Sequence, residues 1–181
     1  MIPRIPIRII HSTMLIIMIV TVSCKNDTTV VNETTSDTAD IQNDKLTKSD
    51  IESIEYTEYV LSDTAEKITE SWSAFLELNR QIEFLKEADL SFFKDDKDIL
   101  RSTLTDLKNE IPETLNQTAI EVRLLALETN IFKLEGIAIL DKAKKTDLIE
   151  SVKDVLLSHT NLIFQINRKL EKDAQNIQKP N

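Results

Sequence analysis

Glycine is almost missing from this chain of 181 residues, in which it occurs once, at Gly136. Of four prolines only Pro112 lies away from the two ends, and aromatic residues make up 5% of the sequence. All-β folds need many tight turns, and those turns need glycine and proline, so this composition argues against them. It predicts an all-α protein of long helices joined by few connections, with a length that suits one domain.

Metal and cofactor ligands are equally scarce, with one cysteine and two histidines in the whole chain. A di-iron site in a helical bundle needs Glu-x-x-His pairs, haem attachment needs Cys-x-x-Cys-His, and zinc needs paired cysteines or histidines. None of these patterns occurs, and no glycine-rich phosphate loop is present. We therefore expect no metal, no cofactor, no catalytic residue and no enzymatic activity. Two acidic clusters lack the glycine of a calcium loop and are interpreted as solvated surface: Asp37, Asp40 and Asp44, and Asp95, Asp96 and Asp98.

Basic residues are outnumbered, 22 against 31 acidic ones, which gives a formal charge of −9. A polyanion would be repelled at long range by such a chain. Nucleic acid is therefore not expected as a partner.

The first 23 residues have the features of an export signal. Residues 1–8 carry two arginines and no acid, and residues 9–22 form an apolar run that ends before the small Ser23. Spanning a membrane takes about 20 apolar residues, and Arg8 and His11 are unfavourable inside lipid. Cleavage is therefore favoured over the alternative, an uncleaved signal anchor on an oligomeric coiled-coil protein.

Cys24, the only cysteine, follows this segment directly. The sequence Thr21-Val22-Ser23-Cys24 resembles the lipobox of bacterial lipoproteins, although threonine stands where leucine is usual. A lone cysteine in an exported chain cannot form an internal disulfide, which also fits a thiol that receives lipid. The resemblance implies removal of residues 1–23 and acylation of Cys24, with palmitate among the chains, as an anchor in the membrane. The mature chain would carry a formal charge of −11.

Lys25 occupies the position where an aspartate resembles an inner-membrane retention mark in enterobacterial lipoproteins. Cys24-Lys25-Asn26-Asp27 also resembles the lysine and acid cluster of surface-displayed lipoproteins of the Bacteroidota. Both resemblances imply a lipid-anchored protein of the cell envelope, held in the outer membrane and facing the periplasm or the surface.

Residues 24–48 comprise the lipidated cysteine and a polar segment with six threonines and no apolar periodicity. Such a composition cannot bury a core, so we expect a disordered tether. Asp27-Thr28-Thr29 and Asp37-Thr38-Ala39 resemble the O-glycosylation acceptor pattern of the Bacteroidota, and a plain solvated linker is the alternative.

Residues 49–176 are predicted to form an antiparallel four-helix bundle with unequal helices, followed by a C-terminal tail, 177–181. Four helices are expected, at 50–87, 96–111, about 114–142 and 147–175. In the first, an apolar seam of four heptads starts after a capping Asp50 and includes Glu58 and Asn79 as polar boundary residues. A coiled coil that oligomerises through this helix is the competing architecture.

The third predicted helix carries two apolar stripes, which predicts that it is the most buried. One stripe is Ile120, Leu124, Leu127, Ile131, Leu134 and Ala138, and the other is Val122, Leu125, Thr129, Phe132, Gly136 and Ile139. A glycine inside a helix costs about 1 kcal/mol relative to alanine, so we expect a neighbouring helix to approach closely at Gly136. In the fourth helix, capped by Asp147, His159 is expected to be a core or boundary histidine bonded to a neighbour. Trp72 and Phe75 are expected in the core.

As a whole, the chain resembles the small all-helical lipoproteins of flavobacteria, a resemblance that carries no functional residue beyond Cys24. We predict an interaction or structural module, displayed on the membrane for an envelope protein or a glycan, and a homo-oligomer is a further expectation. The alternative is a bundle that binds a small apolar ligand in a cavity lined by Phe132, Gly136 and His159.

Overall fold

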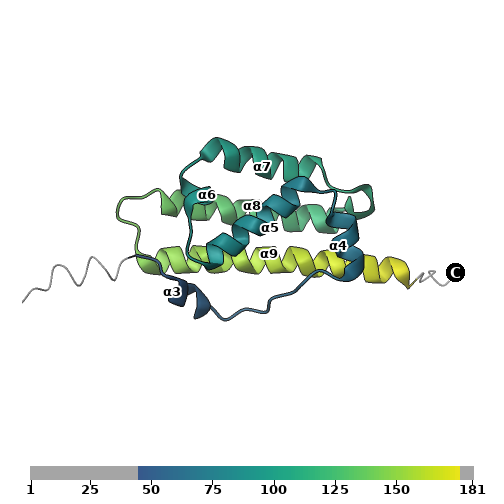
Figure 1. Ribbon diagram of the computed structural model, residues 1–181, viewed down its shortest axis with the longest axis horizontal. Coiled ribbons are helices and arrows are strands. Elements are labelled where there is room, and N and C mark those ends of the chain that lie inside the picture. Colours follow the sequence, from purple (N-terminus) through teal and green to yellow (C-terminus); the bar gives the residue numbers. More distant parts are fainter. Residues whose placement is uncertain (1–44, 176–181) are drawn as a thin grey trace, which may run out of the picture. The chain divides into compact units, whose positions relative to one another are not determined.

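The computed structural model describes residues 45–175, which form a helical domain that contains no strand (Figure 1). The prediction of an all-α fold is confirmed. In chain order the helices are α3 (Lys48–Glu52), α4 (Asp63–Thr69), α5 (Ser73–Lys86), α6 (Ser91–Lys94), α7 (Lys97–Asn109), the 3-10 turn η1 (Glu113–Leu115), α8 (Thr118–Ala138) and α9 (Lys145–Ala174). The predicted signal peptide, Cys24, most of the predicted tether and the tail at 177–181 lie outside the described residues.

Helices α8 and α9 pack side by side over much of their length and run in opposite directions, joined by the short connection 139–144 (Figure 1). Helix α5 packs against α7, and α6 packs against α7 and α8. Helices α5, α7, α8 and α9 are the longest and have unequal lengths. The finer prediction, a regular antiparallel four-helix bundle, stays a prediction. None of the helices within residues 45–175 is long and apolar enough to cross a membrane.

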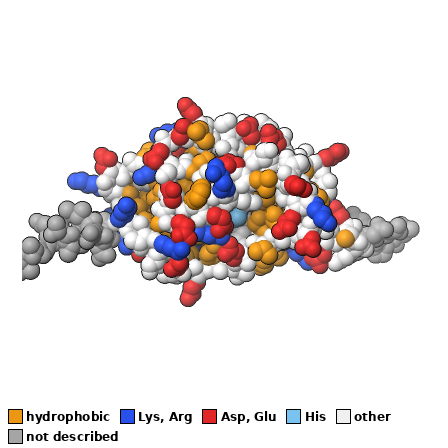
Figure 2. All heavy atoms as spheres, viewed as in Figure 1, with side chains coloured by type: hydrophobic (Ala, Val, Ile, Leu, Met, Phe, Trp, Pro, Cys, Tyr) orange, Lys and Arg blue, Asp and Glu red, His pale blue; other side chains and the backbone are white. Residues whose placement is uncertain are grey.

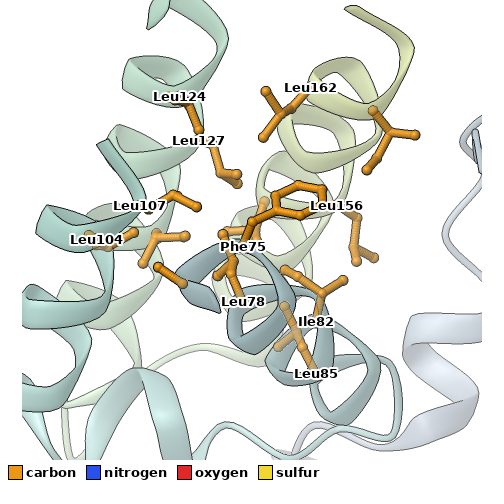
Figure 3. Packing of buried hydrophobic residues seen from close by; sticks show 14 of the residues in the cluster. Phe75, Leu78, Ile82, Leu85, Leu104, Leu107, Leu124, Leu127, Leu156 and Leu162 are labelled. Carbon is orange, nitrogen blue, oxygen red and sulfur yellow. The ribbon is translucent and has the colours of Figure 1, made fainter. Parts of the chain in front are cut away.

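The core gathers around α5. Figure 3 shows its Phe75 and Leu78 between leucines of α7 and α8 on one side and leucines of α9 on the other. Trp72 and Phe75 are fully buried and stack with their ring centroids 4.9 Å apart. The indole Nε1 of Trp72 donates a hydrogen bond of 3.1 Å to the Leu107 carbonyl, which joins α5 to α7. The predicted core position of these two aromatic residues is confirmed.

The predicted first helix, 50–87, is wrong. The chain forms α3, then the non-helical residues 53–62, which we term the strap, and then α4 and α5 (Figure 1). The strap is rich in β-branched and aromatic residues, which lose side-chain freedom in a helix. The predicted seam still identifies buried residues, because Ile51, Ala65 and Ile82 all lie in the core. They reach it from three separate helices.

The backbone of the strap is hydrogen-bonded by two side chains of α9. The hydroxyl of Thr160 donates to the Thr57 carbonyl at 3.0 Å and accepts from the Tyr59 amide at 2.7 Å. Seven residues further along, the amide of Asn167 donates to the Val60 carbonyl at 2.7 Å and accepts from the Ser62 amide at 2.9 Å. These bonds satisfy four backbone groups of the strap that have no helical partner.

Helix α3 begins before the predicted cap. Thr47 is the N-cap, and Asp50 lies at the third helical position, where its carboxylate accepts from the Thr47 amide at 2.8 Å in a capping box. Leu46 is buried, with 5% of its surface exposed. Ordered packing therefore starts with residues that the sequence analysis assigned to the tether. Lys145 of α9 pairs with Asp50 at 2.8 Å, and hydrogen bonds from Lys145 and Thr47 lower the pKa of Asp50 to about 2.

The second and fourth predicted helices match α7 and α9 closely. Asp96 caps α7 by accepting from the amides of Asp98 and Ile99, so the acidic cluster at this point has a role in the helix start. The N-cap of α9 is Lys144, and the predicted cap Asp147 lies inside the first turn. Helix α8 is shorter than predicted, because Pro112 opens η1 and the α-helix starts only at Thr118.

Candidate functional site

Helix α8 has one buried and one exposed apolar stripe, so the prediction that it is the most buried helix is wrong. The inner stripe packs in the core and comprises Ile120, Leu124, Leu127, Ile131 and Leu134, with Ala138 partly buried. The outer stripe comprises Val122, Leu125, Thr129, Phe132, Gly136 and Ile139. Between 36% and 59% of the surface of each of its four large apolar residues is exposed. An apolar face of this length on a charged protein is a candidate interaction surface.

Gly136 lies in this exposed face. No atom lies within 4 Å of the position that a Cβ would occupy there. The predicted close approach of a neighbouring helix is therefore wrong within this chain. The outer stripe therefore has no side chain between Phe132 and Ile139, and the space there is open.

The polar member of the outer stripe is satisfied internally. The Thr129 hydroxyl donates to the Leu125 carbonyl at 2.8 Å, one turn back along the helix. Its hydrogen is thereby used within the helix. Thr129 can then present its methyl group to a neighbour without leaving the hydroxyl unbonded.

Several charged residues on both flanks of the stripe are paired within the chain, whereas Glu121 and Arg123 near the start of α8 form no ion pair within residues 45–175. On the α7 side, Lys108 contacts Glu128 at 2.7 Å, and Arg101 contacts the buried Glu135 at 3.2 Å. On the α9 side, Lys133 contacts Asp154 at 2.8 Å. The guanidinium carbon of Arg101 also lies 5.5 Å from the centre of the Phe132 ring. The stripe is thus bordered by ion pairs and not by a field of one sign.

His159 is a boundary histidine, as predicted. Its Nε2 lies 2.7 Å from the amide oxygen of Asn79 on α5, so the neutral ring donates from this nitrogen. Burial lowers the pKa of His159 to about 4, and the nearby positive charge of Lys86 adds to the effect, whereas Glu58 opposes it. Lys86 bonds to both Glu58 and Glu83. Asn79 and Glu58 were predicted as boundary residues. Asn79 bonds to the imidazole of His159, and Glu58 lies close enough for its charge to act on it.

Phe132, Gly136 and His159 do not line a common cavity. The first two face outward from α8, while His159 contacts α5. A cleft of about 760 Å³ lies elsewhere, where Leu46 and Leu90 meet the connection 139–144 and the adjoining ends of α8 and α9. Within residues 45–175, histidine, cysteine and carboxylate side chains form no group that could hold a metal ion.

Cys24, the predicted lipidation residue, lies outside the described residues. Sequence reasoning did find the outer stripe of α8 but interpreted it as a second buried surface. It missed the bonding of the strap by Thr160 and Asn167. Their spacing of seven residues on the inner side of α9 is the available signal, because a helix repeats its face at that distance.

No protein-family model, curated protein sequence or solved structure matches this chain.

Proposed function

We propose that the chain is a lipid-anchored protein of the cell envelope with two parts: a tether from Cys24 and a helical domain that binds another protein. The observation that carries the second part is the outer stripe of α8. The exposure of its large apolar residues to water is unfavourable in free energy. A neighbouring helix that covered these residues would remove this cost. The N-terminal resemblance to lipoproteins supports the first part.

Mass spectrometry of the N-terminal peptide from envelope fractions tests the anchor. We expect the first residue to be Cys24 carrying acyl chains, with Ser23 absent. Cys24→Ser should leave an uncleaved precursor. Unmodified Cys24 still joined to Ser23 in the mature protein would contradict the lipoprotein reading.

Site-specific photocrosslinking in the native envelope tests the binding surface. A photoreactive amino acid at position 125 should give a discrete crosslinked species, because Leu125 belongs to the outer stripe and is 59% exposed. Position 99 on α7 is the matched control, since Ile99 is 55% exposed but lies outside the outer stripe. Equal crosslinking at both positions, or none at position 125, would contradict an interaction through α8.

A further inference from the structure

We infer that the occupant of the outer stripe is the same stripe of a second copy, packed antiparallel across a two-fold axis. This rests on the proposed function, because it names the partner of the same surface. The register follows from the spacing of the six positions, which alternates steps of three and four residues. This is the seam spacing of a coiled coil.

The spacing reads the same in both directions, so an antiparallel pair brings six positions into six layers. Val122 of one copy faces Ile139 of the other, Leu125 faces Gly136, and Thr129 faces Phe132. The Leu125–Gly136 and Thr129–Phe132 layers each combine a large side chain with a small one. The open space over Gly136 would then be occupied by the Leu125 side chain of the second copy, which accounts for a glycine that no contact inside the chain explains.

A parallel pair fits less well. It would set Gly136 against Gly136 and Phe132 against Phe132, which leaves a void in one layer and crowds another. Close packing with few voids is the norm in protein interfaces. The shape of the stripe therefore favours the antiparallel register.

Electrostatics permit the contact in spite of the formal charge of −9. Glu128, Glu135 and Lys133 flank the stripe, and each is paired with an opposite charge of its own chain. Two copies would therefore not bring uncompensated charges of these three residues together. Glu121, which has no ion pair, would lie at the end of the contact and face Leu140 of the second copy. Thr129 adds no unbonded polar group to the contact, because its hydroxyl is bonded to the Leu125 carbonyl.

The contact is small. The stripe is about 26 Å long at 1.5 Å per residue, and one helix face buries less than the roughly 800 Å² per partner of a standard stable interface. We expect a weak dimer in dilute solution. Anchoring both copies in one membrane would raise their effective concentration and the dimeric fraction.

Disulfide trapping in membranes tests the register with the full chain. Leu125→Cys and Gly136→Cys are placed in two differently tagged copies and oxidised. We expect the mixed pair to form at least tenfold more dimer than either variant alone. In the antiparallel register two copies of position 125 lie about 16 Å apart along the axis, too far for a disulfide. The parent chain is oxidised in parallel to account for any free Cys24 thiol.

A second variant separates dimer formation from folding. Gly136→Leu faces open space within one chain, so it should leave the melting temperature unchanged or raise it. In the dimer it would collide with Leu125 of the second copy. It should therefore reduce trapping between Val122→Cys and Ile139→Cys at least fivefold, whereas Ile99→Glu should leave this trapping unchanged.

Each result decides between the alternatives. Trapping of position 125 with itself would overturn the antiparallel register. Failure of every cysteine pair, together with photocrosslinking from position 125 to a different protein, would overturn self-association but leave the proposed function standing. Failure of both experiments would overturn both proposals.

Discussion

At the scale of single residues, Ala88 has an unusual backbone. Its φ is +65°, and within residues 45–175 it is the one non-glycine residue with a positive φ. It follows α5 in a Schellman motif, in which the Asp89 amide donates to the Phe84 carbonyl and the Ala88 amide donates to the Leu85 carbonyl. Glycine is the usual residue at this position because a Cβ disfavours the left-handed conformation.

Ala88→Gly should therefore stabilise the fold by about 0.5 to 1 kcal/mol, the relief of strain less the greater entropy of the unfolded chain. Urea unfolding followed by circular dichroism measures the change. Ala126→Gly, in the exposed interior of α8, should instead lose about 1 kcal/mol. A loss of stability in both variants would contradict the assigned strain.

His159 makes stability depend on pH. Its pKa is about 4 in the fold and about 6.5 in an unfolded chain, so the unfolded state takes up a proton first as pH falls. Stability is therefore complete above pH 6.5 and declines between pH 6.5 and 4, at a rate that approaches 1.4 kcal/mol per pH unit. His159→Gln should flatten this part of the stability curve.

The contribution of Asp50 has a different range. Its lowered pKa, about 2, makes its stabilisation complete above pH 4 and lost as pH falls towards 2. Unfolding midpoints measured from pH 7 to pH 3 therefore separate the two residues. An unchanged slope between pH 6.5 and 4 in His159→Gln would show that other groups cause the decline.

The identity of single residues predicted whether they are buried better than it predicted their backbone conformation. Trp72 and Phe75 lie in the core as expected, and His159 lies at its boundary. The predicted close approach at Gly136 is wrong, because a glycine in a helix is equally compatible with a near neighbour and with open solvent. The outcome depends on where α7 and α9 pack. Both pack against the side of α8 that carries the inner stripe, which leaves Gly136 exposed.

At the scale of helices and segments, the strap shows why a heptad pattern is not enough to define a helix. Its Ile54 and Leu61 pack against the core, as do Ile51 of α3 and Ala65 of α4. The pattern records which residues are apolar, and both a long helix and an extended segment can bury them. The non-helical conformation of the strap is stabilised by α9, more than a hundred positions later in the chain, where Thr160 and Asn167 form hydrogen bonds with the strap backbone.

Thr160→Val should destabilise the protein by about 1 to 3 kcal/mol, because the Thr57 carbonyl and the Tyr59 amide both lose their partner. Hydrogen exchange should accelerate at Tyr59, with a smaller change at Ser62, whose bond to Asn167 remains. Thr105→Val is the control, because this exposed hydroxyl bonds only within its own helix. Unchanged exchange at Tyr59 would show that the strap is held by other contacts.

At the scale of the whole domain, burial at one end sets the boundary of the folded part. A chain that starts at residue 45 should be about 2 to 4 kcal/mol more stable than one that starts at residue 49, from the burial of Leu46 and the Thr47 cap. Unfolding of the two purified fragments in urea measures the difference. Equal midpoints would place the boundary where the sequence analysis put it.

The surface of the domain mixes both signs of charge. On the face drawn in Figure 2, acidic and basic side chains are intermixed, with hydrophobic side chains between them. Composition correctly predicted the helical class, since it depends on the shortage of turn residues. It could not predict which apolar stripe of α8 faces solvent, because that depends on how few helices are available to cover it.

The order of contacts along the strap has a mechanical consequence. Tension applied at the N-terminal side of the domain acts first on Leu46 and α3, including the Asp50–Lys145 pair. It then acts on the hydrogen bonds of Thr160 to the strap, and after those on the hydrogen bonds of Asn167. Tension therefore acts on these hydrogen bonds one after another and not on all of them at once. Tension applied at the N-terminal side should therefore separate the strap from α9 stepwise, at a lower force than if the four bonds broke together.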